Sequence, residues 1–146
     1  MIKLSTYFMA IAFVMLAATS TQAQCKMFTK KKCMNTLAEY TSNGQYKGVV
    51  MFEGEEATLM QTFYSGKNYK LVVCAHPAIS DGMYFEINDY RGNPIYSSED
   101  SGNPEFEFNV QSTQQLKIRI VVPDQNKEAQ IKKNGCVSVL VGFQEN

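Results

Sequence analysis

The amino-acid sequence predicts an all-β protein: one antiparallel β-sandwich of about eight strands, with a short helical segment near its N-terminus. Two observations predict this class. From about Tyr46 onward, apolar and polar residues alternate with a period of two, which places one face of a strand on a core and the other in water. Turn-forming residues such as Gly, Asn, Asp and Pro separate these runs. Short strands at this spacing favour a sandwich over a sheet built from alternating strands and helices.

The first 23 residues have the three parts of a secretory signal peptide. Lys3 provides the positive charge, an apolar run of about a dozen residues spans 7–18, and Thr21-Gln22-Ala23 offers small residues where signal peptidase reads. The apolar run is shorter than the roughly 20 residues of a membrane span. We therefore expect cleavage after Ala23 and a single domain formed by residues 24–146.

The residues before Cys25 argue against a lipid anchor. A lipobox has a small residue directly before its cysteine and usually Leu three before it, whereas this chain has Gln24 and Gln22 there. Export should therefore release a soluble product into the periplasm or the medium. Loss of Lys3 with the signal leaves 13 Lys+Arg against 14 Asp+Glu, a formal charge of −1, which argues against nucleic acid as a partner.

The expected elements follow in order along the chain. A helical segment is expected over residues 30–39, where Met34 and Leu37 share one side. The alternation is clearest in the second half, as in Phe85-Glu86-Ile87-Asn88. Two runs, 69–75 and 136–143, are apolar on both faces and are predicted to be central strands. The eight strands are expected near residues 46–53, 57–64, 68–75, 83–90, 94–97, 104–110, 115–122 and 136–143.

Cys25, Cys33, Cys74 and Cys136 are an even set in an exported chain and predict two disulfides, although three connectivities are open. Sequence position favours Cys25–Cys33 and Cys74–Cys136, because antiparallel neighbours bring the ends of their strands together. The residues from 25 to 33 could then not all be helical, since eight helical residues span about 12 Å and a disulfide allows about 7 Å. Zinc is the rival interpretation, but no Cys-x-x-Cys pair is present, and we expect no cofactor.

Several short motifs resemble a group of uncharacterised secreted proteins of Bacteroidota. The resemblance extends over nearly the whole mature chain, and its final motif is the most specific. It implies no activity. The motifs are Tyr40-x-x-Asn43-Gly44-Gln45, Gly54-Glu55, Thr62-Phe63-Tyr64-x-Gly66-x-x-Tyr69, Val73-Cys74 and Gly135-Cys136-Val137-x-Val139-Leu140-Val141-Gly142-Phe143.

A looser resemblance is to Golgi-dynamics (GOLD) domains and to bacterial pre-peptidase C-terminal domains. It rests on an Asp-x-x-Gly hairpin and the two strands after it. This resemblance implies a jelly-roll or GOLD-like sandwich that binds proteins or accompanies enzymes without being catalytic. The residues are Phe85-Glu86-Ile87-x-Asp89-x-x-Gly92-Asn93-x-Ile95-Tyr96, Phe106-x-Phe108 and Leu116-x-Ile118.

No catalytic motif stands out. His76 is the only histidine, and no Gly-x-Ser-x-Gly elbow is present. Glu105 and Glu107 share one strand face, about 7 Å apart, but alternating acids are typical of a wet strand face, and the chain has no Trp to stack a sugar. We therefore expect a protein that is not an enzyme. A hydrolase with an unfamiliar site, gathering His76 and two carboxylates, is kept as an alternative.

Two binding chemistries are considered beside protein binding. Asp81, Asp89 and Asp100 lie on expected loops, with Glu99 beside them, and calcium prefers such oxygen ligands. No Asp-x-Asp-x-Asp-Gly loop is present, and turn aspartates are common for local hydrogen bonding. An accessory calcium-binding domain, or one that binds carbohydrate through tyrosines, is therefore a second alternative.

Tyrosines are dense for one small domain and suit an interface, because a large ring is buried while a polar tip stays wet. Tyr84 and Tyr90 are out of phase with Phe85 and Ile87 and should face outward, with Tyr96 nearby. These three tyrosines form the predicted partner surface. The leading hypothesis is an exported, non-catalytic module that binds another envelope or secreted protein, and an assembly subunit using an open sheet edge is a further one.

Overall fold

The structure, a computed structural model, describes residues 20–145, and the side chains from residue 24 onward. Most of the predicted signal peptide, and the side chains at its cleavage site, therefore lie outside the described residues. A continuous helical segment begins this part of the chain: α2 (Ser20–Phe28), the π-helix η2 (Thr29–Cys33) and the 3-10 helix η3 (Met34–Leu37). No helix within residues 20–145 is long and apolar enough to cross a membrane.

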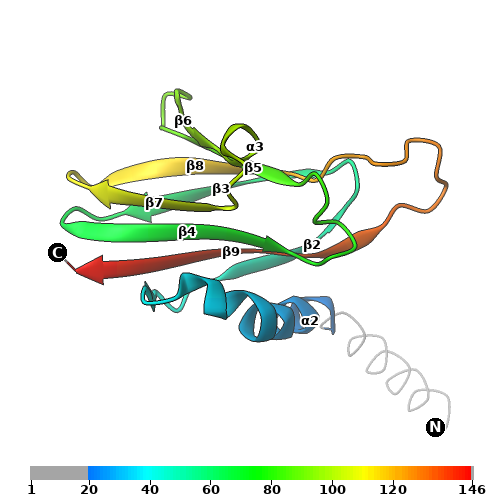
Figure 1. Cartoon of the computed structure of the whole chain (residues 1–146), viewed down its shortest axis with the longest axis horizontal. Helices are drawn as coiled ribbons and strands as arrows, with labels where there is room; N and C mark the ends of the chain where they lie inside the picture. Colours follow the sequence, from blue (N-terminus) through cyan, green and yellow to red (C-terminus); the bar gives the residue numbers. More distant parts are fainter. Residues whose placement is uncertain (1–19, 146) are drawn as a thin grey trace, which may run out of the picture.

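Nine strands follow in two antiparallel sheets packed face to face (Figure 1), which confirms the all-β sandwich. Each of the eight expected strands is present to within two residues at either end, and the ninth, β1, has only two residues. The strands are β1 (Thr41–Ser42), β2 (Lys47–Phe52), β3 (Glu56–Phe63), β4 (Lys67–Ala75), β5 (Tyr84–Asn88), β6 (Pro94–Ser97), β7 (Glu105–Val110), β8 (Gln114–Val121) and β9 (Asn134–Glu145), with a short helix α3 (Ser98–Ser101) after β6.

The five-stranded sheet has the order β1-β9-β4-β7, and β2 pairs with β9 on the same side as β1. The four-stranded sheet has the order β3-β8-β5-β6. The main core lies between them, where alternate residues from both sheets are fully buried, as expected from the period of two. Its most buried members include Phe63, Leu71, Phe85, Ile87, Val110, Leu116, Ile118, Ile120 and Val137.

A second, smaller core explains why β4 and β9 are apolar on both faces. The helical segment covers the outer face of the five-stranded sheet (Figure 1), where Cys33 and Leu37 pack on Val72 and Leu140. One face of each central strand therefore meets the other sheet and the opposite face meets the helix. The prediction that these two runs are central strands is confirmed, since β4 and β9 pair along nine residues.

The disulfide pairing favoured by the sequence is wrong. The bonds join Cys25 to Cys136 and Cys33 to Cys74, so each ties the helical segment to a different central strand. Cys74 lies opposite Ser138, which is two residues from Cys136 on the same face of β9, and the helix places one cysteine over each strand. The expected helix at 30–39 starts ten residues earlier, at Ser20, and ends at Leu37.

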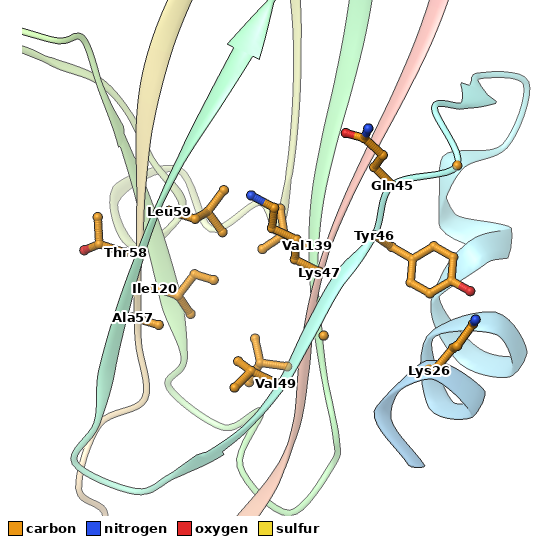
Figure 2. A pocket seen from close by; sticks show the side chains of 13 residues that line it. Lys26, Gln45, Tyr46, Lys47, Val49, Ala57, Thr58, Leu59, Ile120 and Val139 are labelled. Carbon is orange, nitrogen blue, oxygen red and sulfur yellow. The ribbon is translucent and has the colours of Figure 1, made fainter. Parts of the chain in front are cut away.

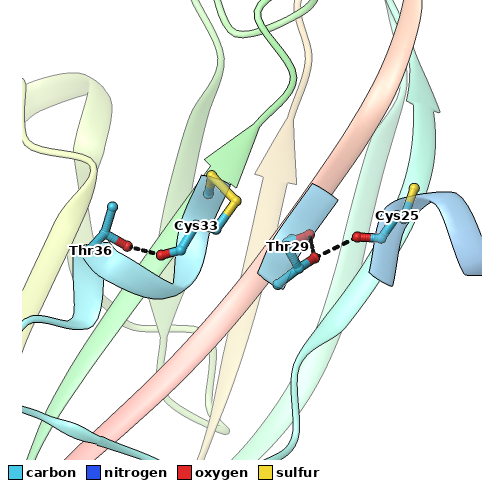
Figure 3. The surroundings of a disulfide bond; sticks show 6 residues. Cys25, Thr29, Cys33 and Thr36 are labelled. Atoms are coloured by element: carbon cyan, nitrogen blue, oxygen red, sulfur yellow. Dashed lines mark hydrogen bonds between the residues drawn. A yellow bond between two sulfur atoms is a disulfide. The ribbon is translucent and has the colours of Figure 1, made fainter. Parts of the chain in front are cut away.

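Between the two bonds, Thr29 fixes the helix against the sheet. Its side chain is fully buried, and its hydroxyl donates to the carbonyl of Cys25 at 2.7 Å and contacts the Ser138 hydroxyl at 2.5 Å. Figure 3 shows Thr29 between Cys25 and Cys33 on the sheet side of the helix. The polar residues of this interface are therefore hydrogen-bonded to each other, as burial requires.

The cross-pairing can be checked directly by peptide mapping without reduction. Trypsin should cleave at Lys26 and the lysines at 30–32, which separates Cys25 from Cys33, and each cysteine then lies in its own peptide. We expect the fragment ending at Lys26 to be linked to 134–146, and 33–47 to be linked to 71–91. A linked pair of 33–47 with the fragment ending at Lys26 would contradict the structure.

Candidate functional site

The structure does not bring the three predicted tyrosines together on one surface. Tyr84 is half-buried on β5, and Tyr90 is 70% exposed in the following turn. Tyr96 lies opposite the buried Ile87, and its ring stacks on Phe106 with centroids 4.3 Å apart. Tyr96 therefore packs at the edge of the core. Of the three tyrosines of the predicted partner surface, Tyr84 and Tyr90 remain accessible to solvent.

Of the aspartates considered as calcium ligands, Asp89 forms hydrogen bonds within its own turn. Asp89 accepts from the amides of Arg91 and Asn93, both at 2.8 Å, and from the Asn93 side chain at 2.7 Å. These hydrogen bonds, the Asn93 side chain first, lower the pKa of Asp89. Asp81 and Asp100 lie in other segments, and residues 20–145 contain no group of three or more His, Cys, Asp or Glu arranged to hold a metal ion.

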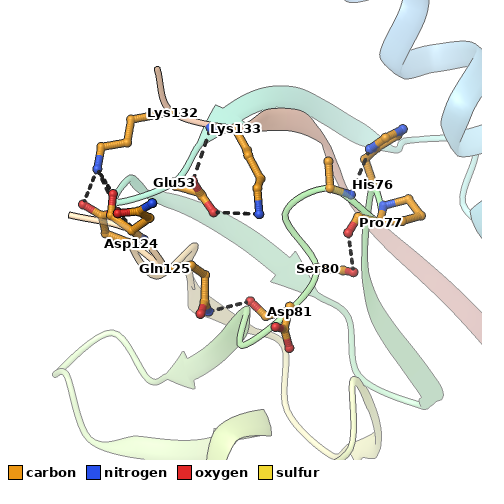
Figure 4. Close-up of polar contacts among 11 residues, drawn as sticks. Glu53, His76, Pro77, Ser80, Asp81, Asp124, Gln125, Lys132 and Lys133 are labelled. Carbon is orange, nitrogen blue, oxygen red and sulfur yellow. Dashed lines mark hydrogen bonds and ion pairs between the residues drawn. The ribbon is translucent and has the colours of Figure 1, made fainter. Parts of the chain in front are cut away.

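The end of the sandwich near His76 holds polar side chains that are already paired (Figure 4). The buried Glu53 accepts from the Lys133 amide at 3.2 Å, and Asp124 binds the Lys132 ammonium at 2.9 Å, which lowers the pKa of Asp124. His76 accepts from the Ala78 amide at 3.2 Å and is not among the residues lining the small hollow of about 180 Å³ there. The described residues thus do not gather His76 with two carboxylates.

Glu105 and Glu107 have a partner that the sequence did not reveal. The ammonium of Lys70, which is nearly buried on β4, lies 2.6 Å from Glu105 and 3.4 Å from Glu107. The hydrogen bond to Glu105, above all, raises the pKa of Lys70. The two glutamates therefore neutralise a buried cation and are not a free carboxylate pair.

The two sides of the sandwich differ in how the sheets meet. On one side, edge strands β6 and β7 are bridged by Tyr96, whose hydroxyl donates to the carbonyls of Asn103 at 2.6 Å and Glu105 at 3.1 Å. On the other side, β2 pairs only with β9 and β3 pairs only with β8. The chain turns directly from β2 into β3, so these two edge strands meet at one end and leave a long seam between them.

This seam holds a groove of about 800 Å³ between β2 and β3. Core residues form its floor, and the two free edge strands form its walls (Figure 2). A second hollow of about 450 Å³ continues along the seam and shares Gln45 with the first. We call both hollows together the seam groove. Its apolar members are Val49, Ala57, Leu59, Met60, Ile120, Val137, Val139, Val141 and Phe143.

Val49 shows that the groove lacks a covering element. It pairs with Val137 in register, so it has the phase of a core residue, as does Met51 two positions later. Met51 is 2% exposed, whereas Val49 is 50% exposed. On the opposite wall, Leu59 faces inward beside Ile118 and is only half-buried. The sandwich is open where one more strand would complete its core.

The groove also exposes the backbone edge of β2. Six consecutive residues, 44–49, line it. Figure 2 shows Lys47 directed into the seam, while Tyr46 and Lys26 lie on the side of α2. Unpaired amide and carbonyl groups along such an edge are ready to pair with another extended chain. Sequence reasoning missed this site because an edge strand and a covered strand have the same alternation.

Comparisons with known proteins find a distant likeness among solved structures. No family model and no curated relative matches the chain. Among solved structures, the chain is similar to PliG of Aeromonas hydrophila, a periplasmic lysozyme inhibitor of g-type lysozyme, at 9% identity over 73% of this chain and 89% of that one, with a TM-score of 0.49. The comparisons assign no function to this chain, and the resemblances noted from the sequence stay predictions.

Proposed function

We propose that this protein is an exported, non-catalytic module that holds an extended segment of another envelope or secreted protein in the seam groove. The observation that carries the proposal is the inward-facing Val49, half exposed beside the free edge of β2. An extended segment laid along this edge would form main-chain hydrogen bonds with β2, and its alternate side chains would enter the seam. Each aliphatic side chain buried there contributes about 1.5–3 kcal/mol.

The chemistry of the groove supports binding over catalysis. Its described lining contains no carboxylate, histidine or cysteine. It contains apolar side chains, three lysines, and amides such as Gln45 and Gln61. Such a lining orients a chain and covers its apolar side chains, and it lacks the carboxylate, imidazole and thiol groups that serve most often in general-base and nucleophilic catalysis. Two disulfides suit an oxidising compartment, which agrees with an exported module.

The proposal is tested by selecting random 12-residue peptides on the exported, disulfide-bonded protein. Ala57 faces into the groove opposite Ile120, so Ala57→Trp should fill it and weaken binding of the selected peptides at least tenfold. Ile95→Trp is the matched control, because Ile95 is 44% exposed on β6, at the opposite edge of the same sheet. Affinity is measured by calorimetry, after thermal melting has shown that both variants fold.

Two outcomes would contradict the proposal. Selected peptides that bind the Ala57→Trp and Ile95→Trp variants equally well would place the binding surface elsewhere. Selection that yields no binding peptide at all would show that the groove does not take extended chains. Hydrogen exchange gives an independent check, since bound peptide should slow exchange of amides in residues 44–49.

A further inference from the structure

We infer that the segment held in the seam groove is acidic, with carboxylate side chains among its aliphatic ones; this inference rests on the proposed function. Three lysines line the groove and no aspartate or glutamate does. Lys26 comes from α2, Lys47 from β2 and Lys67 from β4. The cations thus come from three separate elements: Lys26 and Lys47 line the first hollow of the seam groove, and Lys67 lines the second.

These lysines differ from the protein's paired cations. Lys70, Lys132 and Arg119 each lie within 3.0 Å of a carboxylate oxygen. By contrast, Lys26 and Lys47 are exposed and form no ion pair within residues 20–145. The Lys67 ammonium has one longer ion pair, 3.5 Å from the carboxylate of the exposed Glu145. The whole chain has a formal net charge of zero, so the positive groove is a local feature and not the surface of a basic protein.

The positions of the cations match an added strand. Side chains of an extended segment point alternately to its two faces. Lys47 is directed into the seam, and Lys26 lies beside Tyr46 on the α2 side of the same edge (Figure 2). A strand along β2 would therefore meet a cation on each of its faces. Lys67, whose ammonium lies 4.3 Å from the centre of the Phe143 ring, borders the second hollow further along.

A polypeptide fits this groove better than an anionic amphiphile of the fatty-acid kind. Both would satisfy the lysines and the apolar floor. Only a polypeptide pairs with the free main-chain groups along the outer edges of β2 and β3. Leaving those groups without partners under an acyl chain would cost binding free energy.

The test uses the peptide pool selected on the exported protein. We expect its mean net charge to be negative, and we expect the best peptide to bind about tenfold more weakly when its Asp and Glu are replaced by Asn and Gln. The triple variant Lys26→Gln, Lys47→Gln and Lys67→Gln should lose a similar factor for the acidic peptide and little for the neutral one. The control variant Lys30→Gln, Lys31→Gln and Lys127→Gln removes the same three charges away from the groove. It should bind the acidic peptide with the affinity of the unchanged protein.

The outcomes separate this inference from the proposed function. Equal affinity for the acidic and neutral peptides, with both lost in the Ala57→Trp variant, would overturn the acidic preference and leave the groove as a peptide site. A pool with positive mean charge would also overturn it. Binding of dodecanoate in the groove, with no peptide retained, would overturn both conclusions in favour of an amphiphile site.

Discussion

Replacing both Cys25 and Cys136 by alanine is expected to lower the free energy of unfolding by about 4–5 kcal/mol. The bond closes a sequence separation of 111 residues, so its loss frees the unfolded chain to adopt many more conformations. A domain of this size has about 5–15 kcal/mol of stability in total. The double variant should therefore unfold at much lower denaturant concentration, which equilibrium unfolding in urea measures.

The second disulfide is the matched control for the first. Cys33 and Cys74 are 41 residues apart, so removing both should cost about 4 kcal/mol, somewhat less than removing the longer link. The predicted cleavage after Ala23 would leave a single residue before Cys25, so the Cys25–Cys136 bond would then hold the first residues of the chain to β9. A loss below about 1 kcal/mol for both double variants would contradict the conclusion that these bonds hold the helix to the sheet.

The strands were predictable because their signal is local. Alternation within each run sets which face is buried, and the turn residues between runs set where each strand ends. The continuous apolar character of 69–75 and 136–143 also predicted central strands, and β4 and β9 are central. The helical segment over their second face was predicted only in part, at 30–39, because α2 before it is polar overall and shows Cys25 as its one buried side chain among those described.

The disulfide pairing and the seam groove depend on relations between distant segments. Proximity of Cys25 to Cys33 in sequence favoured a bond that the helix rules out, because consecutive helical turns carry the two cysteines to different strands. Val49 has the sequence pattern of a core residue, and only the strand order shows that nothing lies beyond it. Tyr96 turned inward because a register shift between Ile87 and Asn88 sets its pairing.

The second large effect is expected for Phe63→Ala, which should lower the free energy of unfolding by about 3–5 kcal/mol. Phe63 is the one fully buried side chain of β3, and its ring packs edge-on against Tyr69 and Phe108, each with centroids 5.0 Å away. These contacts join β3, in one sheet, to β4 and β7 in the other. Removing the ring leaves a cavity at the C-terminal end of β3, the strand that forms one wall of the groove. Equilibrium unfolding in urea measures the loss in the free energy of unfolding.

Met60→Ala is the matched control on the same strand, because Met60 is 41% exposed where it borders the second hollow and its truncation should change stability by no more than about 0.5 kcal/mol. If the two variants were equally stable, β3 would be held by its pairing with β8 alone, and Phe63 would not anchor it. If Phe63→Ala has the expected cost, the two aromatic contacts of Phe63 hold the end of β3 against the other sheet, while pairing with β8 holds β3 in its own sheet. The other edge of β3, beside the half-buried Leu59, has no strand partner among the described residues and is the edge that an added strand would meet.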